Sequence, residues 1–226
     1  MRRASLLPLL ALLGLCLLAP APASALDRTV TVNGSATQQV PNDTAGLGFQ
    51  VAKERSSRAA ALRIVAVRLQ AVIAAVEVVP GVGTGDVTTG QISIRKVVRD
   101  KRTLYRASEG ISVTLHQPDR AGELVSAAVA AGATGTSGPR FFPGDPALAY
   151  ESTLLAAFDQ AKAKAAGLAS RAGATLGPAI SIEEGSEVVP NQPQATQKGA
   201  AAEPAPPTKP GSSTVTATVH VVFALQ

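Results

Sequence analysis

The amino-acid sequence predicts an α+β fold, a mixed and largely antiparallel sheet with helices packed on it. Segments of strict polar–apolar alternation, typical of half-buried strands, are separated by segments whose apolar residues recur every three or four positions, as in amphipathic helices. Hydrophobic residues make up 46% of the chain and charged residues 16%, a balance that excludes global disorder. The length of 226 residues fits one compact domain with extra segments.

Two strands and a helix are expected in the first third of the chain. Residues 28–36 alternate, turn residues follow at 41–43, and residues 47–51 alternate again. A helix is expected to begin after Ser56 and Ser57, both good N-caps, and to end at Pro80-Gly81. Its apolar stripe consists of Leu62, Val65, Leu69, Val72 and Val76.

The middle of the chain predicts two strands, a short helix and a fifth strand. Residues 92–98 and 104–115 have the pattern of a hairpin with a basic turn between its strands. Pro118 opens a short helix that ends at Gly132, and residues 134–142 are expected to form the fifth strand.

The last third predicts a long helix, two strands and a loop. An Ala-rich helix covers residues 147–171, and a sixth strand begins at Ile180. Residues 190–211 hold six of the sixteen prolines and no apolar periodicity, which predicts a flexible loop. Strict alternation returns over residues 214–225, so a final strand is expected to rejoin the same sheet. The full order is ββαββαβαββ.

The N-terminus has the three parts of a secretory signal peptide. Arg2 and Arg3 are followed by an apolar run over residues 6–19 and by a small-residue cleavage site at residues 23–25. We therefore predict a signal peptide over residues 1–25 and a single exported domain over residues 26–226, with no transmembrane span after cleavage. The alternatives are a retained membrane anchor, a lipoprotein at Cys16 (although Leu15 precedes it) and a twin-arginine signal.

Cleavage changes the composition of the chain. Removing 25 of the 226 residues leaves 201, takes away the only Cys, and lowers the net charge from +5 to +3 because two arginines are lost. An exported chain of this size without Cys fits a bacterial envelope or secreted protein better than an animal one. The expected location is the periplasm or cell envelope, with secretion as an alternative.

Ten short segments, taken in order, resemble one protein family from about residue 28 to residue 225. They lie at residues 30–36, 40–41, 86–89, 92–94, 105–107, 132–133, 161–172, 176–177, 210–211 and 215–223. Together they resemble the SIMPL domain family, also called DUF541. The chain departs from the family pattern at Asn42, which stands between Pro41 and an aspartate that usually follows the proline directly.

The resemblance implies a class of protein rather than a reaction. Members of the family are mostly exported bacterial envelope proteins, some of them oligomeric and loosely linked to stress tolerance. The family has no agreed catalytic motif, so the resemblance implies no catalytic residue for this chain.

Few residues of the exported chain have the chemistry of a catalytic or metal site. His116 and His220 fall on polar strand faces and are too few for a usual zinc or copper site. The glycine-rich residues 81–85 follow a helix and precede a strand, the reverse of a dinucleotide-binding loop. Glu183 and Glu184 point to opposite faces of a strand. We therefore predict no catalytic residue, metal or cofactor, and keep a hydrolase as a third class of function.

A basic cluster is the best candidate for a binding site. Around the expected hairpin turn one acid, Asp100, stands among six cations: Arg95, Lys96, Arg99, Lys101, Arg102 and Arg106. Such a tip is suited to the phosphate groups of lipids, lipopolysaccharide or nucleic acid. Only Tyr105 interleaves, so no specific nucleic-acid partner is expected. The alternative is a solvated hairpin end that also protects the sheet edge from aggregation.

Self-association is predicted from charge and topology. The net charge of the exported chain repels copies only weakly, and an open sheet of this order leaves at least two edge strands. The Ala-rich helix offers either a subunit contact or, as we favour, a surface that packs on the sheet. We interpret the protein as a non-enzymatic, exported homo-oligomer that acts through self-association and surface contacts. The alternative is a binding protein for an anionic envelope component, such as an anionic lipid, through residues 95–106.

Overall fold

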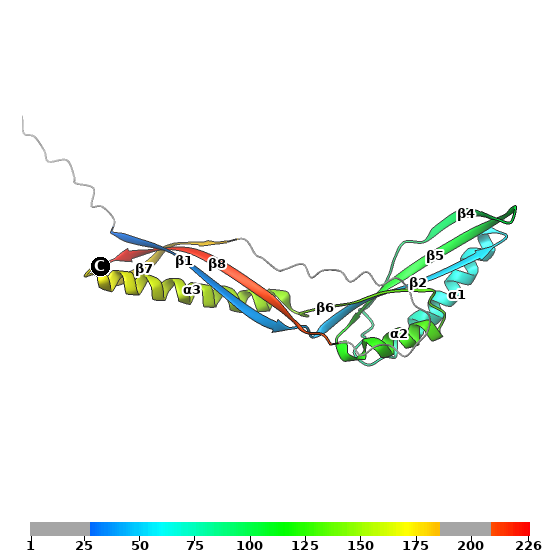
Figure 1. The fold of residues 1–226 in the computed structure, drawn as a ribbon, viewed down its shortest axis with the longest axis horizontal. Helices are drawn as coiled ribbons and strands as arrows, with labels where there is room; N and C mark the ends of the chain where they lie inside the picture. Colours follow the sequence, from blue (N-terminus) through cyan, green and yellow to red (C-terminus); the bar gives the residue numbers. More distant parts are fainter. Residues whose placement is uncertain (1–27, 186–208) are drawn as a thin grey trace, which may run out of the picture.

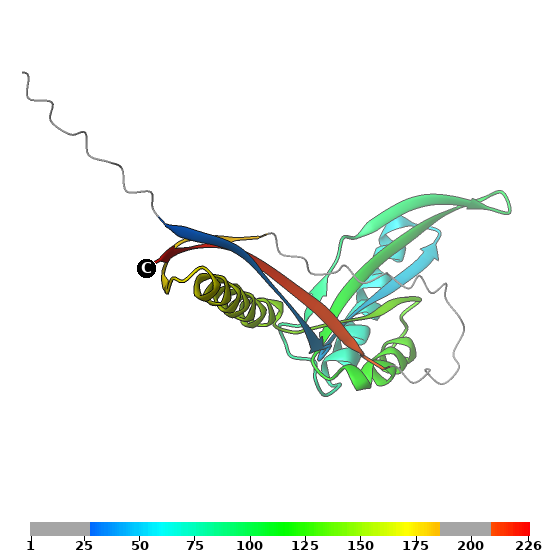
Figure 2. The ribbon, with the colours of Figure 1, turned by 60° about the vertical axis from the view of Figure 1, so that its left-hand side comes forward.

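The computed structural model describes residues 28–185 and 209–226. The signal peptide predicted at residues 1–25 and most of the loop predicted at residues 190–211 lie outside the described residues. The described chain is elongated and consists of two lobes joined end to end, each a sheet with helices on one face (Figures 1 and 2). The α+β class is confirmed, and the strand pairings of the described residues are antiparallel.

The first lobe, called here the α1–α2 lobe, covers residues 44–142. Its sheet has the order β3-β5-β2-β6, with β4 also paired to β5. Helices α1 (Arg58–Glu77) and α2 (Ala121–Ala130) lie on one face of this sheet (Figure 1). Its strands are β2 (Thr44–Arg55), β3 (Val87–Thr89), β4 (Ser93–Arg99), β5 (Arg102–Leu115) and β6 (Gly135–Phe142).

The second lobe, called here the α3 lobe, joins the two ends of the described chain. Strand β8 (Ser212–Leu225) lies between β1 (Thr29–Pro41) and β7 (Leu176–Glu184), and α3 (Pro146–Arg171) packs on one face of these strands. The predicted return of the last strand is therefore confirmed, but the sheet it joins is separate from the sheet of β2 and β5.

The core of the α1–α2 lobe consists of large aliphatic side chains. Ser57 accepts a hydrogen bond from the backbone N–H of Ala60 and so caps α1, whose buried stripe faces β2 and β5. The stripe contains Ala61 where Leu62 was expected, because Leu62 is 38% exposed. Its buried members are Ala61, Val65, Leu69, Val72 and Val76.

Helix α1 is also long and apolar enough to cross a membrane, judged by length and composition alone. Its stripe, however, belongs to a continuous core that includes Phe49 of β2 and Ile111 of β5. A helix with one face buried on a sheet in this way is typical of a packed protein core. We therefore interpret α1 as the core helix of its lobe.

The core of the α3 lobe depends on small residues and close approach. Alanines four residues apart on α3 lie fully buried against β1 and β8, among them Ala157 and Ala161. A Cβ atom on Gly34 of β1 would stand 2.0 Å from the backbone oxygen of Ala157. The helix therefore lies closer to the sheet than any residue with a side chain at position 34 would allow. Of the two alternatives for the Ala-rich helix, the packing on the sheet is observed.

Asn42 joins the two lobes between β1 and β2. Its backbone N–H donates to the oxygen of Gly211 (3.1 Å) and its Nδ2 to the oxygen of Pro210 (2.8 Å), while its Oδ1 accepts from Ser213 Oγ (2.6 Å). Asn42 is 5% exposed, so these bonds form inside the molecule. The extra residue at this turn therefore holds the start of β8 against the end of β1.

Most predicted elements are present, with three differences. The described chain has two sheets where one was expected, because the break at residues 42–43 sends β1 and β2 into different sheets. The short strand β3 is added before the hairpin, so the observed order is ββαβββαβαββ. Strands β1 and β2 are also longer than the alternating segments that predicted them, since both continue to the joint.

Candidate functional site

The basic cluster lies on a regular two-stranded hairpin. Strands β4 and β5 pair without a break from Ser93 opposite Ser108 to Arg99 opposite Arg102. The two turn residues, Asp100 and Lys101, have φ angles of 50° and 63°. Two consecutive positive φ angles are typical of the tight turn whose twist matches that of the strands. The predicted hairpin is confirmed.

Strand alternation sorts the six cations onto different faces. Arg95 lies directly opposite Arg106, and Arg99 lies directly opposite Arg102, so these four arginines share the face turned away from α1. Lys96 lies on the opposite face and Lys101 in the turn. The structure therefore brings four of the predicted residues together and separates the other two from them.

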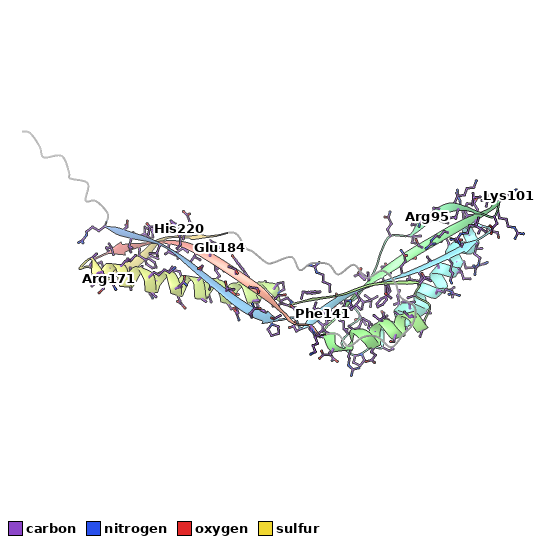
Figure 3. The ribbon with its side chains drawn as sticks, in the orientation of Figure 1. Arg95, Lys101, Phe141, Arg171, Glu184 and His220 are labelled. Atoms are coloured by element: carbon purple, nitrogen blue, oxygen red, sulfur yellow. The ribbon has the colours of Figure 1, made fainter. Side chains whose placement is uncertain are left out.

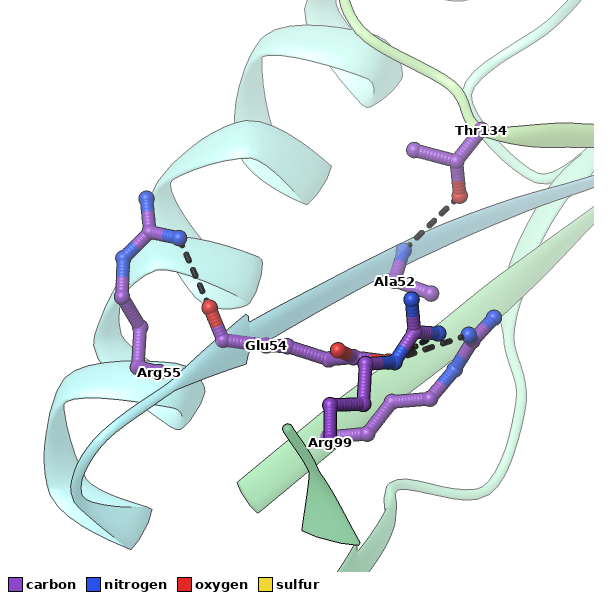
Figure 4. Close-up of polar contacts among 6 residues, drawn as sticks. Ala52, Glu54, Arg55, Arg99 and Thr134 are labelled. Atoms are coloured by element: carbon purple, nitrogen blue, oxygen red, sulfur yellow. Dashed lines mark hydrogen bonds and ion pairs between the residues drawn. The ribbon is translucent and has the colours of Figure 1, made fainter. Parts of the chain in front are cut away.

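Glu54 of β2 is the counter-charge of this arginine face. Its Oε1 lies 3.2 Å from Arg99 Nη2 and 3.5 Å from Arg106 Nη1 (Figure 4). With one carboxylate among four guanidinium groups, the face keeps a net positive charge. Such exposed pairs contribute little to stability, so their main effect is to orient the two arginines.

A shallow recess of about 270 Å³ opens between this pair and β2. It is lined by Ala52, Lys53, Glu54, Arg99 and Arg106. The Nε of Arg106 is buried and has no hydrogen-bond partner among the described residues. A guanidinium with a spare donor beside other cations is the arrangement that binds oxyanions such as phosphate.

The opposite face of the hairpin holds cations that sequence analysis missed. Tyr105 of β5 lies between Lys96 of β4 and Arg55 of β2 in the sheet register. The guanidinium carbon of Arg58, in the first turn of α1, lies 5.2 Å from the centre of the Tyr105 ring, within cation–π range. Arg55 and Arg58 are distant from the hairpin in sequence, and only the pairing of β2 with β5 brings them to it.

Charge is divided unequally between the lobes. The α1–α2 lobe carries thirteen basic and seven acidic residues, whereas the described part of the α3 lobe carries five basic and six acidic ones. Figure 3 shows Arg95 and Lys101 at the opposite end of the molecule from Arg171 and His220. The positive field is thus concentrated at one end.

One protein-family model matches nearly the whole described chain. The family model SIMPL, a protein of unknown function (DUF541), matches residues 30–223. The chain belongs to the SIMPL family. The match spans both lobes, so the suspected relationship is confirmed along nearly all of the described chain. No curated protein matches the chain at a significant level.

The other residues considered for chemistry lie apart in this SIMPL domain. His116 Nε2 lies 3.2 Å from Asp86 Oδ1, and His220 Nδ1 lies 2.6 Å from Asn33 Oδ1 in the other lobe. Glu184 accepts a hydrogen bond from Tyr150 Oη of α3 (2.8 Å). Residues 81–85 form the predicted turn between α1 and β3. Within residues 28–185 and 209–226, no three His, Cys, Asp or Glu side chains form a group able to hold a metal.

One carboxyl group of the SIMPL domain has a clearly shifted pKa. The backbone N–H of Gly83 donates to Asp86 Oδ2 (2.7 Å), and this bond is the main reason that the pKa of Asp86 lies below its usual value. His116 lowers the pKa further, while partial burial opposes the shift. Asp86 thus closes the turn before β3, which is a structural role.

Proposed function

We propose that this SIMPL protein is exported and non-enzymatic, and that it acts through self-association at the edge of the α3 lobe. The observation that carries the proposal is strand β7. Its one partner among the described residues is β8, so within this part of the chain its other edge is unpaired. Ile180 and Ile182 on this edge strand are 60% and 58% exposed. An unpaired edge strand with exposed β-branched residues is a template on which another chain can pair.

The helix beside β7 extends the same apolar surface. Leu154 and Phe158 of α3 are only partly buried against the core of this lobe. A second copy that pairs with β7 would cover apolar side chains and satisfy unpaired backbone groups in one contact, which supports a closed symmetric assembly.

Light scattering coupled to size exclusion tests self-association. We expect wild-type protein at micromolar concentration to run as a discrete oligomer and Ile182→Asp to run as a monomer. Val67→Asp is the matched control, because Val67 is similarly exposed at 61% but lies on α1 in the other lobe. A monomeric wild-type protein over a range of concentration and salt would reject the proposal.

Export is tested on the secreted product. N-terminal sequencing is expected to begin at Leu26, because Ala23 and Ala25 suit the small pockets of signal peptidase. Recovery of Met1, or of a lipidated Cys16, would contradict a cleaved signal peptide. A role in envelope stress tolerance is proposed on family grounds and predicts a survival defect under envelope stress when the protein is removed.

A second candidate function is the binding of an anionic envelope component by the hairpin. The observation that favours it is the single face formed by Arg95, Arg99, Arg102 and Arg106 around Glu54. Because steering by exposed charges weakens with salt, binding to anionic vesicles is expected to fall as ionic strength rises.

Vesicle sedimentation tests this second function. We expect replacement of the four arginines by serine to abolish binding at low salt while leaving the fold intact. The matched control removes four exposed cations of the α3 lobe instead and is expected to keep binding; these are Arg28, Lys162, Arg171 and Lys209. Equal losses in the two variants would show a general charge effect and reject the hairpin as the site.

A further inference from the structure

Exposed apolar side chains stand among the cations of the hairpin. Val98 is 65% exposed and directly precedes Arg99 at the end of β4. Ile92 and Ile94, further back along the same edge, are also exposed. Apolar side chains gathered at an exposed edge mark a contact surface more often than scattered single ones do.

These side chains remain open because β4 extends beyond the helix layer. Ile94, Lys96 and Val98 share the face of the sheet that α1 covers, since they pair with Ala107, Tyr105 and Thr103. Helix α1, however, packs on β5 and β2 rather than on the edge strand β4. The edge strand therefore presents alternating apolar and cationic side chains at the end of the lobe.

The turn is well placed to meet a flat surface. Lys101 lies at the extreme end of the described molecule (Figure 3). Arg99 and Arg102 flank the turn as a cross-strand pair on one face of the hairpin, and Val98 stands next to Arg99 on the opposite face. The one acid of the turn, Asp100, is outnumbered by these cations.

We propose that the hairpin docks by its tip on an anionic phospholipid bilayer, with Val98 entering the boundary between headgroups and acyl chains. The long side chains of Arg99, Lys101 and Arg102 then reach back to the level of the lipid phosphates. The proposal rests on the second candidate function and commits it to one partner. A soluble polyanion would bind the cations and leave Val98 in water, whereas a bilayer interface accepts both kinds of side chain.

An environment-sensitive fluorophore on the hairpin tests the docking directly. The single Cys16 is replaced by serine, and Val98→Cys is labelled with a nitrobenzoxadiazole dye. With vesicles of phosphatidylglycerol and phosphatidylcholine we expect a blue shift and protection from aqueous quencher, and with phosphatidylcholine alone no change. Leu148→Cys is the control, because Leu148 is 62% exposed but lies on α3; its dye is expected to stay in water.

A second variant measures the apolar contribution. Val98→Ser is expected to weaken binding to the anionic vesicles about tenfold, because the buried apolar area of one valine is lost. Val67→Ser, which changes a similarly exposed valine on α1, is expected to leave the affinity unchanged.

The outcomes separate this proposal from the function on which it rests. Vesicle binding that needs the four arginines, without a change of the dye at position 98, would overturn insertion and keep anion binding. The same shift with inorganic polyphosphate in place of vesicles would also overturn insertion. Absence of vesicle binding at low salt would overturn both.

Discussion

The two lobes place a helix on a sheet in opposite ways. In the α1–α2 lobe, valines and a leucine of α1 fill the space above Phe49 and Ile111, so large side chains separate helix from sheet. In the α3 lobe, alanines of α3 meet Gly34 almost backbone to backbone. The core of the α1–α2 lobe is therefore filled by large side chains, whereas the core of the α3 lobe depends on residues small enough for helix and strand to approach closely. The two lobes should respond oppositely to changes in residue size.

The lobes also differ in what they leave exposed. The α3 lobe has nearly balanced charge and an open edge at Ile180 and Ile182, whereas the α1–α2 lobe has a large excess of cations. We propose that one end associates with copies and the other with an anionic surface.

Leu69→Ala in α1 is expected to give the largest loss of stability. Leu69 is buried in the core of the α1–α2 lobe, and deletion of a buried leucine side chain lowers the free energy of unfolding by about 3 to 4 kcal/mol. Urea denaturation followed by far-UV circular dichroism measures the change. A loss below about 1 kcal/mol would contradict a core supported by side-chain volume in this lobe.

Gly34→Ala tests the effect of added side-chain volume in the α3 lobe. One added methyl group would overlap the backbone of Ala157, so we expect a loss of about 2 to 3 kcal/mol by the same measurement. Gly167→Ala on the outside of α3 is the control, since nothing lies within 4 Å of its added Cβ. It should stabilise the protein by about 0.5 to 1 kcal/mol. If both substitutions are tolerated, the close approach is wrong.

Asn42→Ala tests the joint between the lobes. The substitution removes the side-chain bonds to Pro210 and Ser213, and we expect a loss of about 1 to 2 kcal/mol. Asn33→Ala removes a contact of similar length to His220 on an exposed surface and should change the stability by less than about 0.5 kcal/mol. Similar effects for the two asparagines would contradict the role given to Asn42.

Asp86→Asn is expected to give the smallest loss of stability, and this loss should depend on pH. Its folded-state pKa lies below the unfolded value of 3.8, so the ionised carboxylate stabilises the fold above that pH. This contribution is lost as the pH falls through the folded-state pKa. Wild-type protein should therefore be slightly more stable than Asp86→Asn near pH 6, and the difference should disappear in strong acid. A difference that does not decrease as the pH falls below 3.8 would contradict this origin.

Sequence patterns within single segments predicted most helices and strands. Features that depend on contacts between distant parts of the chain were not predicted. Alternation over residues 214–225 and the basic turn were sufficient to predict β8 and the hairpin, because each depends on its own side chains. The division into two sheets depends on long-range pairing, because β1 pairs with β8 and β2 pairs with β5. The contact of Arg58 with Tyr105 of the hairpin likewise depends on how α1 packs on the sheet. Ala61 is buried in the stripe of α1 where Leu62 was predicted, because packing against the sheet decides which face of the helix is turned inward.

The central claim is that the two ends of the molecule make different contacts. Hydrogen–deuterium exchange on the same protein, dilute, concentrated and bound to anionic vesicles, tests it most directly. We expect that concentration adds protection over Leu176–Glu184 and that vesicles add protection over Ser93–Arg99 and the turn beside it. Protection of the hairpin by concentration, or of β7 by vesicles, would contradict the claim.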